Sequence, residues 1–115
     1  MQAIVKDISN DFFDLKKFVP DDPHCFDLLV RICIGRTDTV GADDFYLNIC
    51  TPEWLAKNIW QPTWGRHMLI VREYNLPVIE KFIGDYVATC QGDKWNAIGE
   101  RLGRMFTWEF EDYKR

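Results

Sequence analysis

Apolar residues recur at every second position in two neighbouring segments of the chain. They are Phe26, Leu28, Val30, Ile32 and Ile34 in the first segment, and Phe45, Leu47 and Ile49 in the second. This period of two is typical of strands that turn one face towards a core. Gly35 to Asp43 lies between the segments and predicts a hairpin, which makes the two strands antiparallel neighbours. Leu29 and Cys33 occupy the other face of the first strand and indicate a central strand that is at least partly covered on both sides.

Three shorter segments predict further strands. Residues 2–8 form the first, and residues 67–72 form another that resembles a central strand, because both of its faces are apolar. Near the end of the chain, Trp108 and Phe110 alternate with two glutamates, which favours a last edge strand. Both rings are expected in the core, since large aromatic side chains usually bury most of their area.

Helical patterns occupy the remaining segments. Thr51-Pro52-Glu53 predicts a short helix over residues 52–58, because threonine caps a free amide and proline lacks the amide that would stay unpaired. Ser9 or Asn10 can cap an early helical turn. Pro77 opens a longer helix that Gly92 ends, with a buried stripe of Ile79, Phe82, Ile83, Tyr86, Val87 and Cys90. Asp93 is expected to cap the last helix, which buries Trp95, Ile98 and Leu102 and in which Gly99 and Gly103 either weaken the helix or permit close packing.

Strands early and helices late predict an α+β fold. We expect an antiparallel sheet of about four to five strands, with two C-terminal helices packed on one face. With 115 residues, of which 47% are apolar and 15% aromatic, residues 1–115 fit a single domain with one core.

Composition also bears on location. The sequence lacks an apolar run of the roughly 20 residues that a membrane-spanning helix needs, and Lys6, Asp7 and Asp11 interrupt the segment where a secretory signal would lie. We therefore expect a cytoplasmic protein that does not associate with membranes. Its four widely spaced cysteines are expected to be reduced and mostly buried.

The net charge of −4 is concentrated in the first half, where residues 1–53 hold ten acidic and five basic side chains. A nucleic-acid-binding surface needs the opposite sign, so nucleic acid is not expected as a direct partner. Ser9 is the only serine, and the cysteines and histidines lack the spacing of a metal site or a nucleophilic pair. No cofactor, metal or enzymatic activity is therefore predicted.

Three blocks of the sequence carry a resemblance. They are Thr51-Pro52-Glu53-Trp54-Leu55, Gly65-Arg66-His67-Met68-Leu69-Ile70-Val71 and Trp108-Glu109-Phe110-Glu111-Asp112-Tyr113, the last preceded by the helix that Asp93 opens. In this order the blocks resemble the immunity protein 8 family of bacterial polymorphic toxin systems, over nearly the whole chain. The resemblance implies a protein that binds a partner toxin and neutralises it, without catalysis of its own.

An inhibitor of a toxin with a cationic cleft, such as a nuclease, needs acidic groups that speed encounter and apolar anchors that slow dissociation. The candidate toxin-binding residues are Asp21, Asp22, Asp38, Asp43, Asp44, Trp60, Trp64, Glu109 and Glu111. Two alternatives stay open for them. The tryptophans could fold back onto the core, and the C-terminal acids could pair with Arg101 and Arg104 instead of a toxin.

Two further alternatives concern the whole protein. A small-ligand or regulatory binding module could use the sheet face and the loop that holds Trp60 and Trp64 as its pocket. A homodimer could form through an uncovered sheet face or edge.

Overall fold

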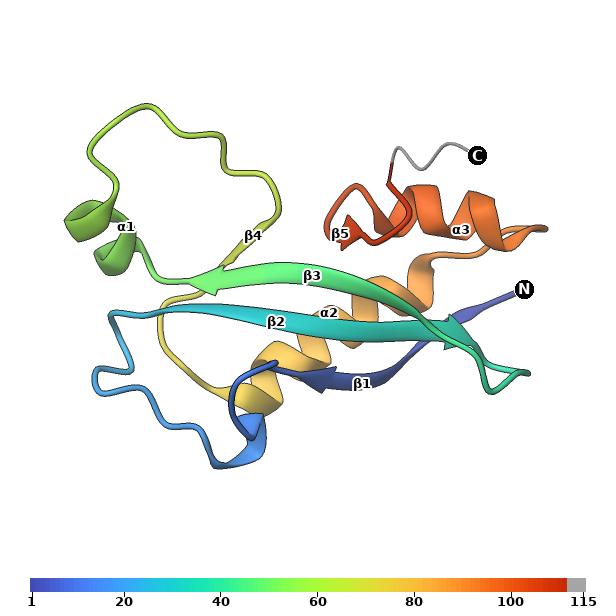
Figure 1. Ribbon diagram of the computed structural model, residues 1–115, viewed down its shortest axis with the longest axis horizontal. Helices are drawn as coiled ribbons and strands as arrows, with labels where there is room; N and C mark the ends of the chain where they lie inside the picture. Colours follow the sequence, from blue (N-terminus) through green and yellow to red (C-terminus); the bar gives the residue numbers. More distant parts are fainter. Residues whose placement is uncertain (112–115) are drawn as a thin grey trace.

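The computed structural model describes residues 1–111 of the chain (Figure 1). Its elements are β1 (Ala3–Ser9), the 3-10 helix η1 (Leu15–Lys17), β2 (Asp27–Arg36), β3 (Asp43–Cys50), α1 (Pro52–Asn58), β4 (Met68–Ile70), α2 (Leu76–Thr89), α3 (Trp95–Leu102) and β5 (Thr107–Trp108). The α+β class is confirmed, and so is the added strand near the end of the chain.

The sheet has the order β1-β2-β3-β4, and β5 pairs with β3. The β1–β2, β2–β3 and β3–β5 pairs are antiparallel, whereas β3 and β4 run parallel. The parallel pair arises because α1 and the long segment after it carry the chain back before β4 begins, as a parallel connection requires. β4 and β5 therefore share the outer edge of β3, and β4 is an edge strand and not the predicted central one.

The core lies on one face of this sheet. The strands bury Leu28, Val30, Ile32, Ile34, Phe45, Leu47 and Ile49 there. The helices bury Ile79, Ile83 and Val87 from α2, and Ile98 and Leu102 from α3. Figure 1 shows α2 crossing behind β2 and β3, which agrees with the predicted placement of the helices on one face.

The opposite face of the sheet is only partly covered. Leu29, at the middle of this face, is 46% exposed, and Cys33 is half-buried. β2 is central, as predicted, and the partial cover predicted for its second face is found at Cys33 but not at Leu29. The reason is that α2 and α3 both add their apolar side chains to the same core, so neither is left for the second face.

The N-cap residue predicted from the sequence is right for α1 and wrong for α3 and for the early helical turn. The Thr51 hydroxyl accepts from the amide of Trp54 at 3.3 Å, and α1 has the predicted bounds. By contrast, Lys94 and not Asp93 is the N-cap of α3, and no side chain caps it. The early helical turn is the short η1, capped by Asp14, while Asn10 instead accepts from the amide of Phe12 at 2.8 Å.

The C-terminal rings differ in their burial. Trp108 packs against the core, with its ring nearly parallel to that of Phe45 at a centroid distance of 6.1 Å. Phe110 meets Trp108 edge-on and is 43% exposed, so its predicted core position is wrong. Asp112 and Tyr113 lie outside the described residues.

Gly99 is the point at which α3 meets this C-terminal strand. A Cβ atom at Gly99 would lie 2.6 Å from the ring of Trp108, which is closer than side-chain atoms pack. Glycine is thus required for close approach, one of the two roles considered for it in the sequence.

We predict that Gly99→Ala lowers the free energy of unfolding by about 1–3 kcal/mol, because the Trp108 ring must shift to admit the methyl group. Urea denaturation followed by tryptophan fluorescence measures this change. Gly84→Ala is the matched control, since nothing lies within 4 Å of its added Cβ. The control should gain about 0.5–1 kcal/mol from helix propensity. Equal midpoints for the two variants would contradict the close packing.

Candidate functional site

The segment between α1 and β4 projects from the molecule as a loop, which we call the indole loop, residues 59–66 (Figure 1). All eight of its residues are exposed. Trp60 is 84% exposed and Trp64 is 92% exposed. The alternative in which these tryptophans fold back onto the core is thereby excluded. Two large rings in water are an unusual arrangement for a folded protein that functions alone.

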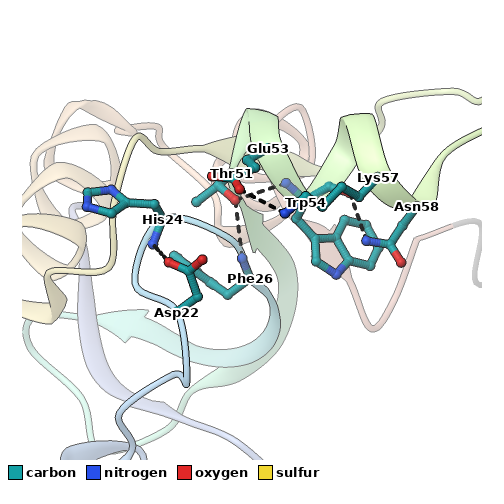
Figure 2. A network of polar contacts seen from close by, with 8 residues as sticks. All are labelled: Asp22, His24, Phe26, Thr51, Glu53, Trp54, Lys57 and Asn58. Atoms are coloured by element: carbon teal, nitrogen blue, oxygen red, sulfur yellow. Dashed lines mark hydrogen bonds and ion pairs between the residues drawn. The ribbon is translucent and has the colours of Figure 1, made fainter.

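Both ends of the indole loop are anchored. At the first end, the Ile59 amide donates to the carbonyl of Leu55 at 2.9 Å, and the Asn58 side chain donates to the carbonyl of Trp54 at 2.9 Å. Figure 2 shows this second bond beside the Thr51 cap. These contacts hold the loop entrance on the end of α1.

At the second end, His67 is nearly buried and touches the C-terminal segment. Its Nδ1 lies 2.7 Å from the Thr107 hydroxyl, and its Nε2 lies 3.0 Å from both the Gly103 carbonyl and the Arg66 Nε. A neutral ring can either accept from Arg66 or donate to Gly103 through Nε2, but not both. Arg66 also forms an ion pair with Glu111. The loop exit is therefore joined to residues that follow α3.

Two of the candidate acids lie at the same end of the molecule as α1. Asp21 and Asp22 are exposed in the loop before β2, and Asp22 accepts from the amide of His24 at 2.9 Å (Figure 2). Glu53 raises the pKa of Lys57 through a hydrogen bond, and Asp22 raises it further through its charge. The Phe26 amide, which follows this loop, donates to the hydroxyl of Thr51, the N-cap of α1, at 3.2 Å (Figure 2), so the loop that holds Asp22 lies against the start of α1, and the indole loop departs from the other end of that helix.

The other candidate acids lie at the far end of β2 and β3. Asp38 sits in the hairpin, and Asp43 and Asp44 begin β3. Asp44 and Asp43 pair with Cys33 and Ile34, which lie roughly 20 Å along β2 from Asp27 at about 3.3 Å per residue, and Asp38 lies beyond the end of the strand. Asp38 pairs with Arg36 at 2.6 Å, and this hydrogen bond lowers the pKa of the Asp38 carboxyl. The structure therefore divides the acids between two ends of the molecule.

Asp43 has an internal role. Its Oδ2 accepts from the indole nitrogen of Trp95 at 2.7 Å and from that of Trp108 at 3.0 Å. One carboxylate thus joins the start of β3 to α3 and to β5. Buried indole N–H groups require an acceptor, so Asp43 stabilises the attachment of the C-terminal part of the fold.

Glu109 and Glu111 also have partners within the chain. The Glu109 carboxylate accepts from the Asp44 amide at 2.8 Å, while the Glu109 amide donates to the Asp44 carbonyl at 3.1 Å. Glu111 pairs with Arg66. The predicted alternative partners, Arg101 and Arg104, are not the ones observed for these two acids.

The described residues give little support for a metal site, a reactive thiol or a membrane-spanning helix. Residues 1–111 contain no group of three or more histidine, cysteine or acidic side chains placed to hold a metal ion. All four cysteines are free, with Cys50 and Cys90 buried and Cys25 and Cys33 half-buried. Burial, with Asp44 beside it, raises the pKa of the Cys33 thiol to about 11, which disfavours the reactive thiolate. In the same range, no helix is long and apolar enough to cross a membrane.

Comparison with known families decides the relationship. The profile described as immunity protein 8 matches residues 3–113. The chain belongs to the immunity protein 8 family. The resemblance drawn from the three sequence blocks is thus confirmed, while no curated protein and no solved structure matches the chain.

In this immunity protein 8 chain, each of the three blocks includes a scaffold contact. Thr51 is fully buried and joins β2 to α1, because its hydroxyl accepts from the amides of Phe26 and Trp54. His67 joins β4 to the C-terminal segment, and Trp108 joins β5 to Asp43. The indole loop contributes only Gly65 and Arg66 to these blocks.

The sequence did not show where two surfaces of this family member lie. One is the uncovered face of the sheet around Leu29. The other is a cavity of about 170 Å³ between α2 and β4, lined by Leu47, Met68, Leu69, Phe82, Ile83, Tyr86, Met105 and Phe106. Phe82 is 61% exposed and not buried as predicted. No local pattern reveals either surface, since both depend on how distant elements meet.

We predict that Asp43→Ala lowers the free energy of unfolding by about 2 kcal/mol, because two indole N–H groups lose a charged acceptor. Chemical denaturation measures the change. Asp38→Ala is the matched control and should leave the midpoint nearly unchanged, since its ion pair is exposed. If both variants unfold at the wild-type midpoint, the internal role of Asp43 is wrong.

Proposed function

We propose that this member of the immunity protein 8 family binds a cognate polymorphic toxin and neutralises it in the cytoplasm of the cell that makes both proteins. The inhibition is stoichiometric. The protein occludes the active site of the toxin, or a surface next to it, and makes and breaks no covalent bond. The observation that carries this proposal is the exposure of Trp60 and Trp64 on a loop whose two ends are anchored.

The two indoles suit the centre of a protein interface. A tryptophan ring buries about 150–250 Å² and is among the side chains that most often dominate binding energy. The anchored ends limit the conformations that the loop can adopt, so less entropy is lost when a partner orders it. Trp60 and Trp64 would therefore slow dissociation of the complex.

Charge at the same end supports the choice of partner. Asp21 and Asp22 are exposed near α1, and the whole chain carries a net charge of −4. Acidic groups beside apolar anchors speed the approach of a cationic surface and help to align it. A toxin that acts on nucleic acid has such a surface in its active cleft. A nuclease is the toxin class that this arrangement fits.

The remaining candidate acids are assigned differently. Asp43 and Glu109 hold the C-terminal segment, so we place them outside the proposed contact, whereas Glu111 pairs with Arg66 and anchors the exit of the indole loop. Asp38 lies at the opposite end of β2. The small-ligand alternative gains nothing from the indole loop, since rings that are mostly exposed do not enclose a ligand.

Co-expression tests the proposal. The partner is the C-terminal domain encoded by the gene adjacent to this one, and growth of the host reports neutralisation. We expect the wild-type chain to rescue growth and to copurify with that domain. Trp60→Ala and Trp64→Ala should each weaken the complex by about 2 kcal/mol, roughly thirtyfold in Kd. Their melting temperatures should match the wild type, because neither ring contributes to the core.

Val40→Ala is the control, since Val40 is also exposed but lies in the hairpin between β2 and β3. It should rescue growth fully. Absence of rescue by the wild-type chain would overturn the proposed function. Full affinity in both Trp60→Ala and Trp64→Ala would overturn the choice of surface.

A further inference from the structure

The face of the sheet opposite the core forms a second exposed surface, which we call the open face. Strand register places its side chains in rows across β2 and β3, with Leu29 beside Asn48, Arg31 beside Tyr46 and Cys33 beside Asp44, and at one end Asp27 pairs with the fully buried Cys50. Ile70 of β4 joins the row of Cys50 and is exposed. The open face thus runs across three strands with Leu29 near its middle.

The open face mixes apolar contacts with an excess of acids. Its acidic side chains are Asp7, Asp11, Asp27 and Asp44, and its basic ones are Lys6 and Arg31. Both bases already have partners in the chain. Arg31 lies 2.8 Å from Asp11 and 3.9 Å from Asp44, and Lys6 donates to the carbonyl of Thr39. The charge that remains for a partner is therefore negative.

Asp27 and Asp7 carry that remaining charge. Asp27 accepts from the Asn48 side chain at 3.1 Å through one of its two carboxylate oxygens, and both aspartates are exposed. Among residues 1–111, no basic side chain lies within ion-pair distance of either one. A second copy of the chain would place these acids against like charges, so the open face selects a partner of opposite sign.

Contacts within the chain connect the open face to the indole loop. Tyr46 on this face pairs with Thr107 of β5, and the Thr107 hydroxyl bonds His67 at 2.7 Å. His67 directly follows the indole loop. The open face and the loop therefore meet at the outer edge of β3, where one partner can contact both.

We propose that the open face is a docking surface for a basic patch of the toxin, with Leu29 and Tyr46 as apolar contacts and Asp27 as an ionic one. The inference rests on the proposed function and extends it. Leu29 is exposed within a polar surround, the arrangement of an interface centre with a polar rim. The indole loop then supplies one part of the contact, and the open face supplies the other.

Opposite charges at one position test this proposal. Leu29→Arg and Leu29→Glu introduce unbranched, flexible side chains that carry charges of opposite sign. Binding is measured against the C-terminal domain encoded by the adjacent gene, at low and at physiological salt. We expect Leu29→Arg to bind at least about tenfold more weakly than Leu29→Glu at low salt, and the difference to shrink as salt rises. Val40→Arg controls for net charge and should bind like the wild type.

Equal affinities for the two Leu29 variants, or weaker binding by Leu29→Glu, would overturn the open face as a site for a basic partner. If Leu29→Arg does not fold, Asp27→Lys compared with Asp27→Asn decides by the same criterion, with the lysine variant expected to bind more weakly. Failure of the wild-type chain to bind the domain at all is a different result, because it rejects the proposed function itself.

Discussion

Burial of one face of the β2–β3 ladder against α2 and α3 is the interaction on which the rest of the structure depends. Side chains along both strands point alternately to the two faces of the sheet, so the neighbour of each apolar side chain in the core lies on the opposite face. Because both long helices occupy the same side, the second face keeps polar neighbours and a few exposed apolar groups. The surface available to a partner is thus a direct result of how the core is formed.

The outer edge of β3 shows how the same scaffold positions the indole loop. β4 and β5 share that edge, and His67, Arg66 and Glu111 connect them across it. A bare edge would expose unpaired amides and carbonyls to other chains. Here the edge is covered by short strands from distant parts of the sequence, and the loop between α1 and β4 is left projecting with its rings in water. The contacts that cover the outer edge of β3 therefore also hold the exit of the indole loop.

Sequence patterns predicted the elements that local chemistry determines. Thr51-Pro52-Glu53 fixed the bounds of α1, since cap and proline act within one turn, and the alternation after Phe26 fixed the core face of β2. Contacts between distant residues were not predictable. Asp43 has the appearance of a solvated loop acid in the sequence, yet its partners Trp95 and Trp108 lie 52 and 65 positions away. The parallel pairing of β4 and the exposure of Phe82 depend on similar long-range packing.

Only part of the candidate site could be predicted from the sequence, because its arrangement also depends on contacts between distant residues. Absence of a periodic stripe around Trp60 and Trp64 indicated a loop, and the structure exposes both rings. The acids could be identified by type, but their division between two ends follows from the length of β2. The uncovered face around Leu29 required knowledge of which side the helices take.

The central claim is that the indole loop and the open face together contact the toxin. Hydroxyl-radical footprinting of the free protein and of its complex with the toxin domain measures the solvent access of these side chains directly. We predict that Trp60, Trp64 and Leu29 lose reactivity in the complex, while Val78 and Phe82 on the exposed side of α2 keep it. Protection of Val78 and Phe82, with the two indoles as reactive as in the free protein, would contradict it.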